Sequence, residues 1–213
     1  MAHSAEKYIG ELIAQGEHQQ LDFKFEINDA RKIARTLSAF ANTDGGKLLI
    51  GVKDNGKIAG IRTEEEYHMI EAAAQMYCKP ELIFESRKWN ILGKTILEVT
   101  IGESSHRPCL AQSDDGKWLA YVRVDDQNIR ANGVLLKVWR KEKRKKGILI
   151  KYSKTEEVLL DYLEESDDIS LSKFCRISKI SRQQGEEVLA KLISLDILEI
   201  RISEKGAVYS LQK

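Results

Sequence analysis

Hydrophobic and polar positions along the first 136 residues follow two periods, one typical of helices and one typical of strands. Apolar residues recur at helical spacing in three segments, and we predict helices at 4–15, 30–42 and 63–77. They alternate with polar residues, or form short apolar runs, in five segments with predicted strands at 21–25, 47–52, 82–89, 95–101 and 118–124. Ser4 is expected to cap the first helix, and Thr63 with Glu66 to open the third. Helices interspersed with hairpin-linked strands predict an α/β (α+β) domain with a mixed sheet.

The C-terminal residues show a different order of elements. Helical spacing at 154–164 and 171–174 predicts two helices, and Ser181 is expected to cap a third. Two strands follow, at 197–202 and 208–211. Three helices and a hairpin describe a winged helix, a helix-turn-helix variant that places its third helix in the major groove when it binds DNA.

Charge is distributed unevenly, although 34 Lys and Arg against 33 Asp and Glu give a net charge of only +1. Between residues 137 and 151 eight basic residues stand against Glu142 alone, where a helix beginning near Arg130 is expected to run into the basic segment. The parts before and after it each carry a net charge of −3. We therefore divide the chain into an α/β domain at 1–136, a basic connection at 137–151 and a winged helix at 152–213.

Composition argues against membrane and disulfide-rich classes. No apolar run approaches the roughly 20 residues that a bilayer span needs, and the N-terminus lacks the apolar core of a signal peptide. Three cysteines, far apart in the sequence, fit neither a disulfide framework nor a zinc site. We expect a cytoplasmic protein with no membrane contact.

Two strings of residues in the predicted α/β domain form an ordered pattern. The segment AFANTDGG at 39–46 is followed by LIGVKDNG at 49–56 and then Gly60, while residues 17–24 and Tyr121-Val122-Arg123 match strands before and after. Over about residues 5–135 this pattern resembles the Schlafen/AlbA-like domain family. The resemblance implies an AlbA-like fold. It also implies a nucleic-acid-binding regulator, an ATP-binding protein or, as in some Schlafen members, a metal-dependent ribonuclease.

The resemblance places the three carboxylates of a Schlafen ribonuclease at Glu17, Asp22 and Asp54, with Lys24 two residues past the second. Asp22 stands where the family usually has Glu, which shortens the side chain by one methylene. Three such carboxylates could bind Mg²⁺ or Mn²⁺, and the ion would activate water and neutralise a phosphodiester transition state. Lys24 could contact phosphate as a point charge. The alternative interpretation is that all four side chains lie on a solvated surface.

The glycine-containing turn at 42–46 could cradle a phosphate with its backbone amides. However, the chain has no GxxxxGK[ST] pattern, and this turn follows a predicted helix instead of opening one. We interpret it as a helix-to-strand connection. ATP is not expected, and no other cofactor is expected unless the ribonuclease alternative supplies Mg²⁺ or Mn²⁺.

Residue types that contact phosphates and bases lie in the basic connection and around the third predicted winged-helix helix. With Lys24, the candidate nucleic-acid-binding residues are Arg140, Lys141, Lys143, Arg144, Lys145, Lys146, Lys179, Arg182 and Gln183. Trp139 could stack on a base or anchor the helix. The basic run could also be a solvated linker. Glu186 and Glu187 favour protein contacts as the alternative for the winged helix.

We interpret the chain as a nucleic-acid-binding protein, a transcriptional regulator that binds DNA in preference to RNA. The chain has room for one AlbA-like lobe, whereas Schlafen ribonuclease cores resemble two, and we therefore expect a homodimer with paired winged helices. The alternative is a divalent-metal-dependent endoribonuclease that uses Glu17, Asp22 and Asp54. A third possibility is a protein-interaction module that dimerises through its winged helix.

Overall fold

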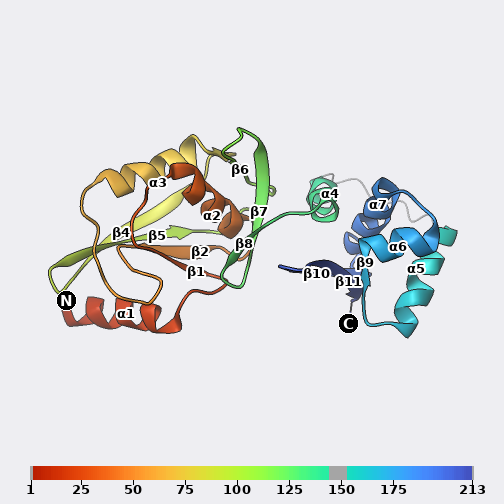
Figure 1. Ribbon diagram of the computed structural model, residues 1–213, viewed down its shortest axis with the longest axis horizontal. Coiled ribbons are helices and arrows are strands. Elements are labelled where there is room, and N and C mark those ends of the chain that lie inside the picture. Colours follow the sequence, from red (N-terminus) through yellow and green to blue (C-terminus); the bar gives the residue numbers. More distant parts are fainter. Residues whose placement is uncertain (1, 144–152, 213) are drawn as a thin grey trace. The chain divides into compact units, whose positions relative to one another are not determined.

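The computed structural model describes residues 2–143 and 153–212, with side chains from Ser4 onward. The chain forms two units, Met1–Arg130 and Ala131–Lys213. Figure 1 shows the helices and strands of each unit.

A four-stranded mixed sheet is the centre of the first unit. Its strands lie in the order β1 (Leu21–Lys24), β2 (Gly46–Ile50), β5 (Lys94–Ile101) and β4 (Phe84–Ile91). β1 and β2 are parallel, because the chain between them crosses over through helix α2 (Ala30–Asn42), while the other neighbours are antiparallel. The period of two in β1 sends Leu21 and Phe23 to one face and Asp22 to the other.

Helices cover both faces of this sheet (Figure 1). Helix α1 (Ala2–Gln15) packs on the face that presents Leu21 and Phe23, and contributes Ile9 to that core. Helices α2 and α3 (Glu65–Gln75) pack on the other face, against Leu48 and other apolar residues of β2 and β5. The strands therefore have apolar residues on both faces, which explains their short apolar runs.

A second, antiparallel sheet packs against α2. Its strands lie in the order β3 (Cys78–Lys79), β6 (Leu110–Gln112), β7 (Trp118–Val124) and β8 (Gln127–Arg130). Asn42, the last residue of α2, ties the helix to this sheet: its amide nitrogen donates to the carbonyl oxygens of Cys109 and Tyr121, both at 2.8 Å, and its oxygen accepts from the Cys109 N–H at 2.7 Å. Asn42 lies within the AFANTDGG segment and is buried. Its hydrogen bonds to buried backbone groups explain why the fold needs an asparagine at this position.

In its described residues, the second unit combines four helices with a three-stranded sheet. Its elements are α4 (Gly133–Glu142), α5 (Lys154–Glu165), β9 (Ile169–Ser170), α6 (Leu171–Ser178), α7 (Arg182–Ile193), β10 (Leu198–Ser203) and β11 (Gly206–Leu211). β11 pairs with both β10 and β9, antiparallel in each case. Ser153 and Ser181 begin α5 and α7 with capping boxes. The core includes Val134 and Val138 of α4, so this helix is part of the unit.

Most predicted elements are confirmed, and the differences have local causes. Ser4 does not cap α1, which already begins at Ala2. Thr63 lies one position before the N-cap of α3, and the Glu66 carboxylate accepts from its N–H and its hydroxyl. β3, β6 and β8 have two to four residues each, too few for the period of two to show.

The boundary between the units also differs from the predicted one. The chain divides after Arg130 and not after residue 136, because α4 packs on α7. Residues 137–142 are therefore part of a packed helix of the second unit and not of a connection. No helix in the described ranges is long and apolar enough to cross a membrane.

Candidate nucleic-acid interface

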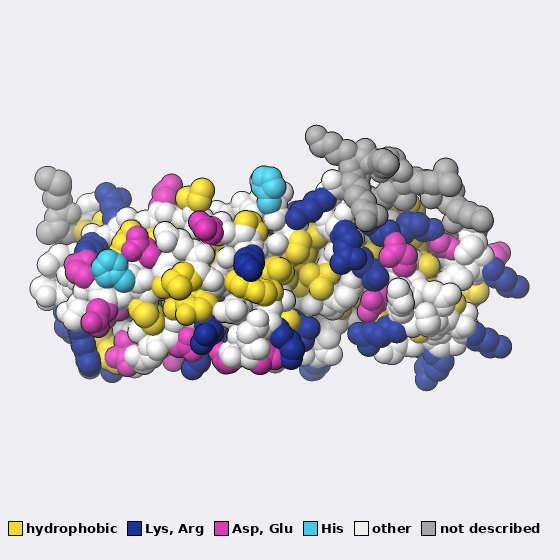
Figure 2. Space-filling model, turned by 90° about the horizontal axis from the view of Figure 1, so that it is seen from above, with side chains coloured by type: hydrophobic (Ala, Val, Ile, Leu, Met, Phe, Trp, Pro, Cys, Tyr) yellow, Lys and Arg dark blue, Asp and Glu magenta, His cyan; other side chains and the backbone are white. Residues whose placement is uncertain are grey.

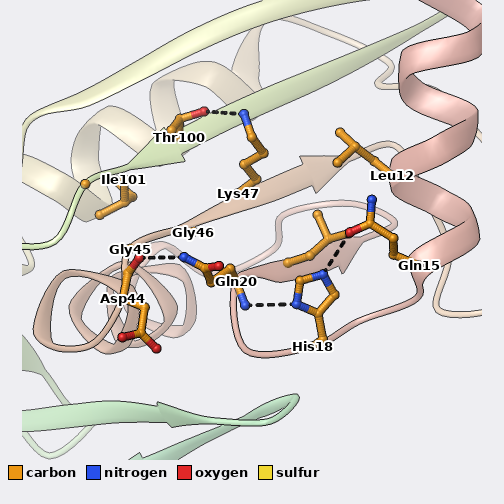
Figure 3. Close-up of a pocket in the computed structure, with 12 residues that line it drawn as sticks. Leu12, Gln15, His18, Gln20, Asp44, Gly45, Gly46, Lys47, Thr100 and Ile101 are labelled. Atoms are coloured by element: carbon orange, nitrogen blue, oxygen red, sulfur yellow. Dashed lines mark hydrogen bonds between the residues drawn. The ribbon is translucent and has the colours of Figure 1, made fainter.

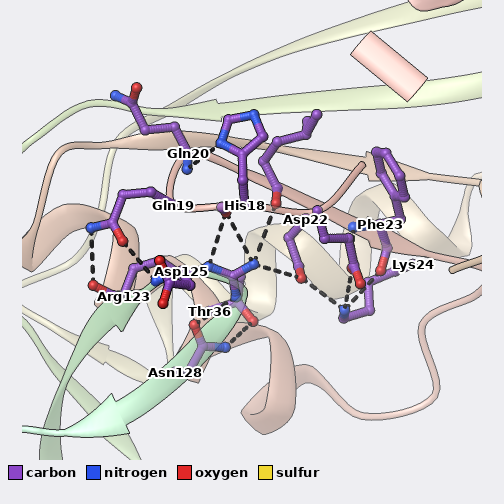
Figure 4. Close-up of polar contacts among 12 residues, drawn as sticks. His18, Gln19, Gln20, Asp22, Phe23, Lys24, Thr36, Arg123, Asp125 and Asn128 are labelled. Carbon is purple, nitrogen blue, oxygen red and sulfur yellow. Dashed lines mark hydrogen bonds and ion pairs between the residues drawn. The ribbon is translucent and has the colours of Figure 1, made fainter. Parts of the chain in front are cut away.

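Three charged side chains meet beside β1 in the first unit (Figure 4). Asp22, only 3% exposed, accepts from the Arg123 guanidinium at 3.1 Å through Oδ1, and its Oδ2 lies 2.7 Å from the Lys24 ammonium. Lys24 also donates to the Phe23 carbonyl at 2.7 Å. The alternation in β1 points Asp22 away from α1, toward the side where β7 delivers Arg123. Asp22 is therefore a buried, neutralised carboxylate.

Arg123 holds this part of the unit together. Its guanidinium donates to the carbonyl oxygens of His18 and Leu21, at 3.4 and 3.3 Å, and to Asn128 at 3.1 Å. It also lies over the Phe40 ring, 5.3 Å from the ring centroid. The side chain is 1% exposed. Arg123 is the arginine of the Tyr-Val-Arg string, and its place is structural because its donors face protein acceptors and not solvent.

Glu17 lies next to this cluster. Its carboxylate accepts from the Phe23 N–H at 2.8 Å and lies 3.9 Å from the Lys24 ammonium. Burial raises the pKa of Glu17 above its ordinary value, and the neighbouring Asp22 carboxylate acts in the same direction. Two of the three predicted carboxylates are thus brought together, with Lys24 beside both.

The third predicted carboxylate does not join them. Asp54 is exposed in the turn at 53–56. Among the described residues, no group of three or more His, Cys, Asp or Glu side chains is placed to hold a metal ion. Since Arg123 and Lys24 already engage both oxygens of Asp22, the residues do not fit the Mg²⁺ or Mn²⁺ of the ribonuclease alternative. The predicted catalytic and metal-binding set of Glu17, Asp22 and Asp54 is not assembled in the structure.

The turn at 42–46 is a helix-to-strand connection, as predicted. The Gly45 N–H donates to the Phe40 carbonyl at 3.0 Å, and the Thr43 hydroxyl donates to the Ala39 carbonyl at 2.8 Å. Gly45 has φ of +68°, and a Cβ there would lie 2.7 Å from the Ile101 carbonyl oxygen. A glycine is therefore required at this position by the fold alone.

In the second unit, α4 neutralises two acidic residues of α7. Lys141 forms an ion pair with Glu187, and Lys137 lies 3.7 Å from Glu187 and 4.0 Å from Glu186. The Lys141 ammonium lowers the pKa of Glu187. A Cβ at Gly133 would lie 2.6 Å from the Glu186 carboxylate, so the start of α4 lies close against α7. Lys141 was predicted to contact nucleic acid, but in the structure its ammonium pairs with Glu187.

Other predicted contact residues of the second unit remain exposed. Arg140 and Lys143 are exposed on and just after α4, and Lys179, Arg182 and Gln183 are exposed around the start of α7. Arg182 lies 3.2 Å from Glu186 on its own helix. Trp139 is 3% exposed, so it anchors α4 and is not available to stack on a base. Arg144, Lys145 and Lys146 lie outside the described residues.

One group of residue types typical of nucleic-acid contacts was missed by the sequence reasoning. The Phe25 ring, half-buried after β1, has the Lys53 ammonium 4.9 Å and the Arg62 guanidinium 5.9 Å from its centroid. This group is hard to recognise in the sequence. Phe25 continues the alternation of β1, and Lys53 and Arg62 lie in two separate loops. An aromatic ring flanked by cations is a common element of nucleic-acid surfaces.

Comparison with known proteins agrees with this arrangement of the first unit. The family model described as Schlafen, AlbA_2 matches residues 17–132. The chain belongs to this Schlafen, AlbA_2 family. The match covers Asp22, Asn42 and Arg123 together and ends at the start of α4. The Schlafen, AlbA_2 match therefore spans the first unit from residue 17 onward and leaves out α1.

Two solved structures resemble this Schlafen, AlbA_2 protein at low identity. The DIP2311 protein from Corynebacterium diphtheriae is 16% identical with a TM-score of 0.48, and the match covers 99% of this chain and 39% of that one. The N-terminal domain of a RecG-related protein from Nitrosomonas europaea is 20% identical with a TM-score of 0.43, and the match covers 70% of this chain and 96% of that one. The chain thus spans less than half the length of the first of these proteins.

Proposed function

We propose that this protein binds nucleic acid, DNA in preference to RNA, and acts as a regulator of transcription. Membership of the Schlafen, AlbA_2 family supports nucleic-acid binding in general. The specific proposal is that the second unit is a winged helix with α7 as its recognition helix and the β10–β11 hairpin as its wing. The order of helix, strand, helix, helix and hairpin from α5 to β11 supports this assignment.

The observation that carries the proposal is the neutralisation of Glu186 and Glu187 by α4. Two free carboxylates on a recognition helix would repel DNA phosphates. Here Lys137 and Lys141 pair with them, while the first turn of α7 keeps exposed residue types that read bases and hold phosphates. The acidic residues of α7 therefore do not argue against contact with DNA. Lys and Arg side chains are spread over the surface of this unit in Figure 2.

Arg182 and Gln183 provide the direct test. Replacing both by Ala should weaken binding to a preferred DNA site by about 1–3 kcal/mol for each side chain that forms a bidentate pair with a base. The effect should be smaller on random duplex DNA, because non-specific binding depends on phosphate contacts. Fluorescence anisotropy with both duplexes, and with a double-stranded RNA of equal length, measures these differences.

Arg87→Ala gives the matched control. Arg87 is exposed on β4 of the first unit, 4.4 Å from the centroid of the Trp89 ring, and lies outside the proposed winged helix. The change removes one exposed cation, as Arg182→Ala does, so it should leave DNA affinity unchanged. An equal effect of the two changes, or none from Arg182 and Gln183, would assign α7 to protein contacts instead.

We also propose a homodimer, because two copies would pair two winged helices across a two-fold axis. Light scattering should give about twice the 24.2 kDa of one chain at micromolar concentration. A single-chain mass both with and without DNA would contradict this part of the proposal.

The remaining parts of the proposal concern cofactors and location. Ribonuclease activity has no support from the described residues, because the three carboxylates it needs do not come together. The proposal includes no cofactor. A cytoplasmic location is consistent with three cysteines that are all free thiols.

A further inference from the structure

A hollow of about 370 Å³ lies in the first unit beside β1 (Figure 3). His18 and Leu21, which line it, also supply carbonyl oxygens to the Arg123 guanidinium. It is bounded by the end of α1, the segment before β1, the turn before β2 and the end of β5. Leu12, Leu21 and Ile101 give it apolar walls, and Gln20 and His18 give it polar groups. Its volume is at the lower end of the range for small-molecule sites, about 300–1,000 Å³, which suits a ligand the size of a nucleoside.

His18 presents a fixed aromatic ring at this hollow. Its Nδ1 accepts from the Gln20 N–H at 3.2 Å, which assigns the ring hydrogen to Nε2, 3.2 Å from the Gln15 amide oxygen. The ring is therefore held from both nitrogens (Figure 3). No aromatic side chain among the described residues stacks on it. A ring held in place at the wall of a hollow is a platform for a planar ligand.

The charges at the hollow favour an uncharged ligand. Lys47 is held by Glu98 at 2.6 Å, and Asp44 is held by the Gln19 amide at 2.9 Å. One cation and one anion, each already paired, leave little attraction for a phosphate. The Gln20 amide nitrogen donates to the Asp44 carbonyl at 2.8 Å, while its oxygen accepts no hydrogen bond from a described residue. That oxygen can accept from the edge of a ligand.

We propose that this hollow binds one nucleobase, stacked on the His18 ring and hydrogen-bonded at its edge to Gln20. If the base is part of a nucleic-acid strand, this inference rests on the proposed function. It then gives the first unit a role in nucleic-acid binding. A base within a duplex is stacked and paired, so the hollow would select unstacked bases and hence single-stranded segments. A free nucleoside has the same chemistry, and the experiment separates the two sources.

Two glycines allow a matched test. Gly102 lines the hollow, and Gly10 lies on α1 outside it. A Cβ added at either position meets nothing within 4 Å, and neither glycine has a φ in the left-handed region. Gly102→Phe should place a ring in the hollow, and Gly10→Phe should add the same ring elsewhere, with both variants retaining the melting temperature.

The first measurement uses a single-stranded DNA of 12 nucleotides that carries one 2-aminopurine. Wild type and Gly10→Phe should quench its fluorescence by stacking, while Gly102→Phe should quench it less and bind at least tenfold more weakly. The second measurement adds adenosine, guanosine, cytidine or thymidine to wild type and follows the His18 ring protons by NMR. A shift that saturates for one or more nucleosides, and is absent in Gly102→Phe, supports the pocket without relying on the variant's affinity for strands.

The outcomes separate this inference from the proposed function. If wild type binds DNA, but Gly102→Phe quenches and binds as well as Gly10→Phe and no nucleoside shifts His18, the pocket is refuted and the proposed function stands. If wild type binds no nucleic acid while a nucleoside still shifts His18, the proposed function fails and the hollow is a site for free nucleosides. If neither is observed, both are refuted.

Discussion

Replacing Arg123 by Met is expected to destabilise the first unit by about 3–5 kcal/mol, the usual cost of removing one partner of a buried ion pair. The guanidinium is 1% exposed and contacts Asp22 at 3.1 Å, so its removal leaves a buried carboxylate with Lys24 as its remaining cation. Urea unfolding of the full chain, followed by far-UV circular dichroism, should show the transition of this unit at a lower midpoint.

Arg87→Met is the control for this prediction. Arg87 is exposed and lies over the Trp89 ring at 4.4 Å, so its replacement should change stability by no more than about 0.5 kcal/mol. Combining Arg123→Met with Asp22→Asn should cost less than the two single changes added together, because the second change removes the uncompensated charge. Additive effects, or an Arg123→Met variant as stable as the control, would mean that the pair contributes nothing as a pair.

Asn42→Leu is expected to produce the second large destabilisation, about 2–4 kcal/mol. Asn42 is 3% exposed and makes hydrogen bonds of 2.7–2.8 Å with buried backbone groups of Cys109 and Tyr121. Removing a partner from a buried polar group costs about 1–3 kcal/mol, and leucine offers neither donor nor acceptor. The same urea experiment measures the change.

If Asn42 acts by joining α2 to the second sheet, its replacement should loosen that sheet more than the first one. Amide hydrogen exchange should accelerate in β6 and β7 more than in β1, because Asn42 joins α2 to the second sheet. Asn90→Leu, at an exposed position of β4, should leave stability and exchange nearly unchanged. Exchange that rises equally in both sheets would show that Asn42 does not act through this local connection.

The local elements could be predicted from the sequence because they depend on periodicity and caps. The alternation of Leu21 and Phe23 located β1, and Ser181 located the start of α7. The environment of Asp22 could not be predicted in this way. A polar residue in an alternating strand indicates a solvent-facing position, but here the partner that allows burial, Arg123, is 101 residues away in sequence.

The same limit applies to the candidate site. Glu17 and Asp22 were expected to be neighbours and are, because only four residues separate Glu17 from Asp22 in β1. Asp54 follows a different strand, and whether its turn brings it to the others depends on the path of the chain after β2. Likewise, the basic pattern of α4 did not indicate that Lys137 and Lys141 face Glu186 and Glu187, since charge patterning along one helix does not specify its partner helix.

The packing of α4 on α7 decides how this chain can be dissected and recombined. Helix α4 belongs with the C-terminal unit, although the family pattern ends just before it and a composition-based boundary would cut through it. A fragment or chimera that starts at residue 137 would lack Val134 in the core and Gly133 beside Glu186. The transferable module begins at Ala131. If this module were fused at Ala131 to a different domain, Lys137 and Lys141 would still pair with Glu186 and Glu187. The surface charge of α7 would therefore not depend on the domain to which the module is joined.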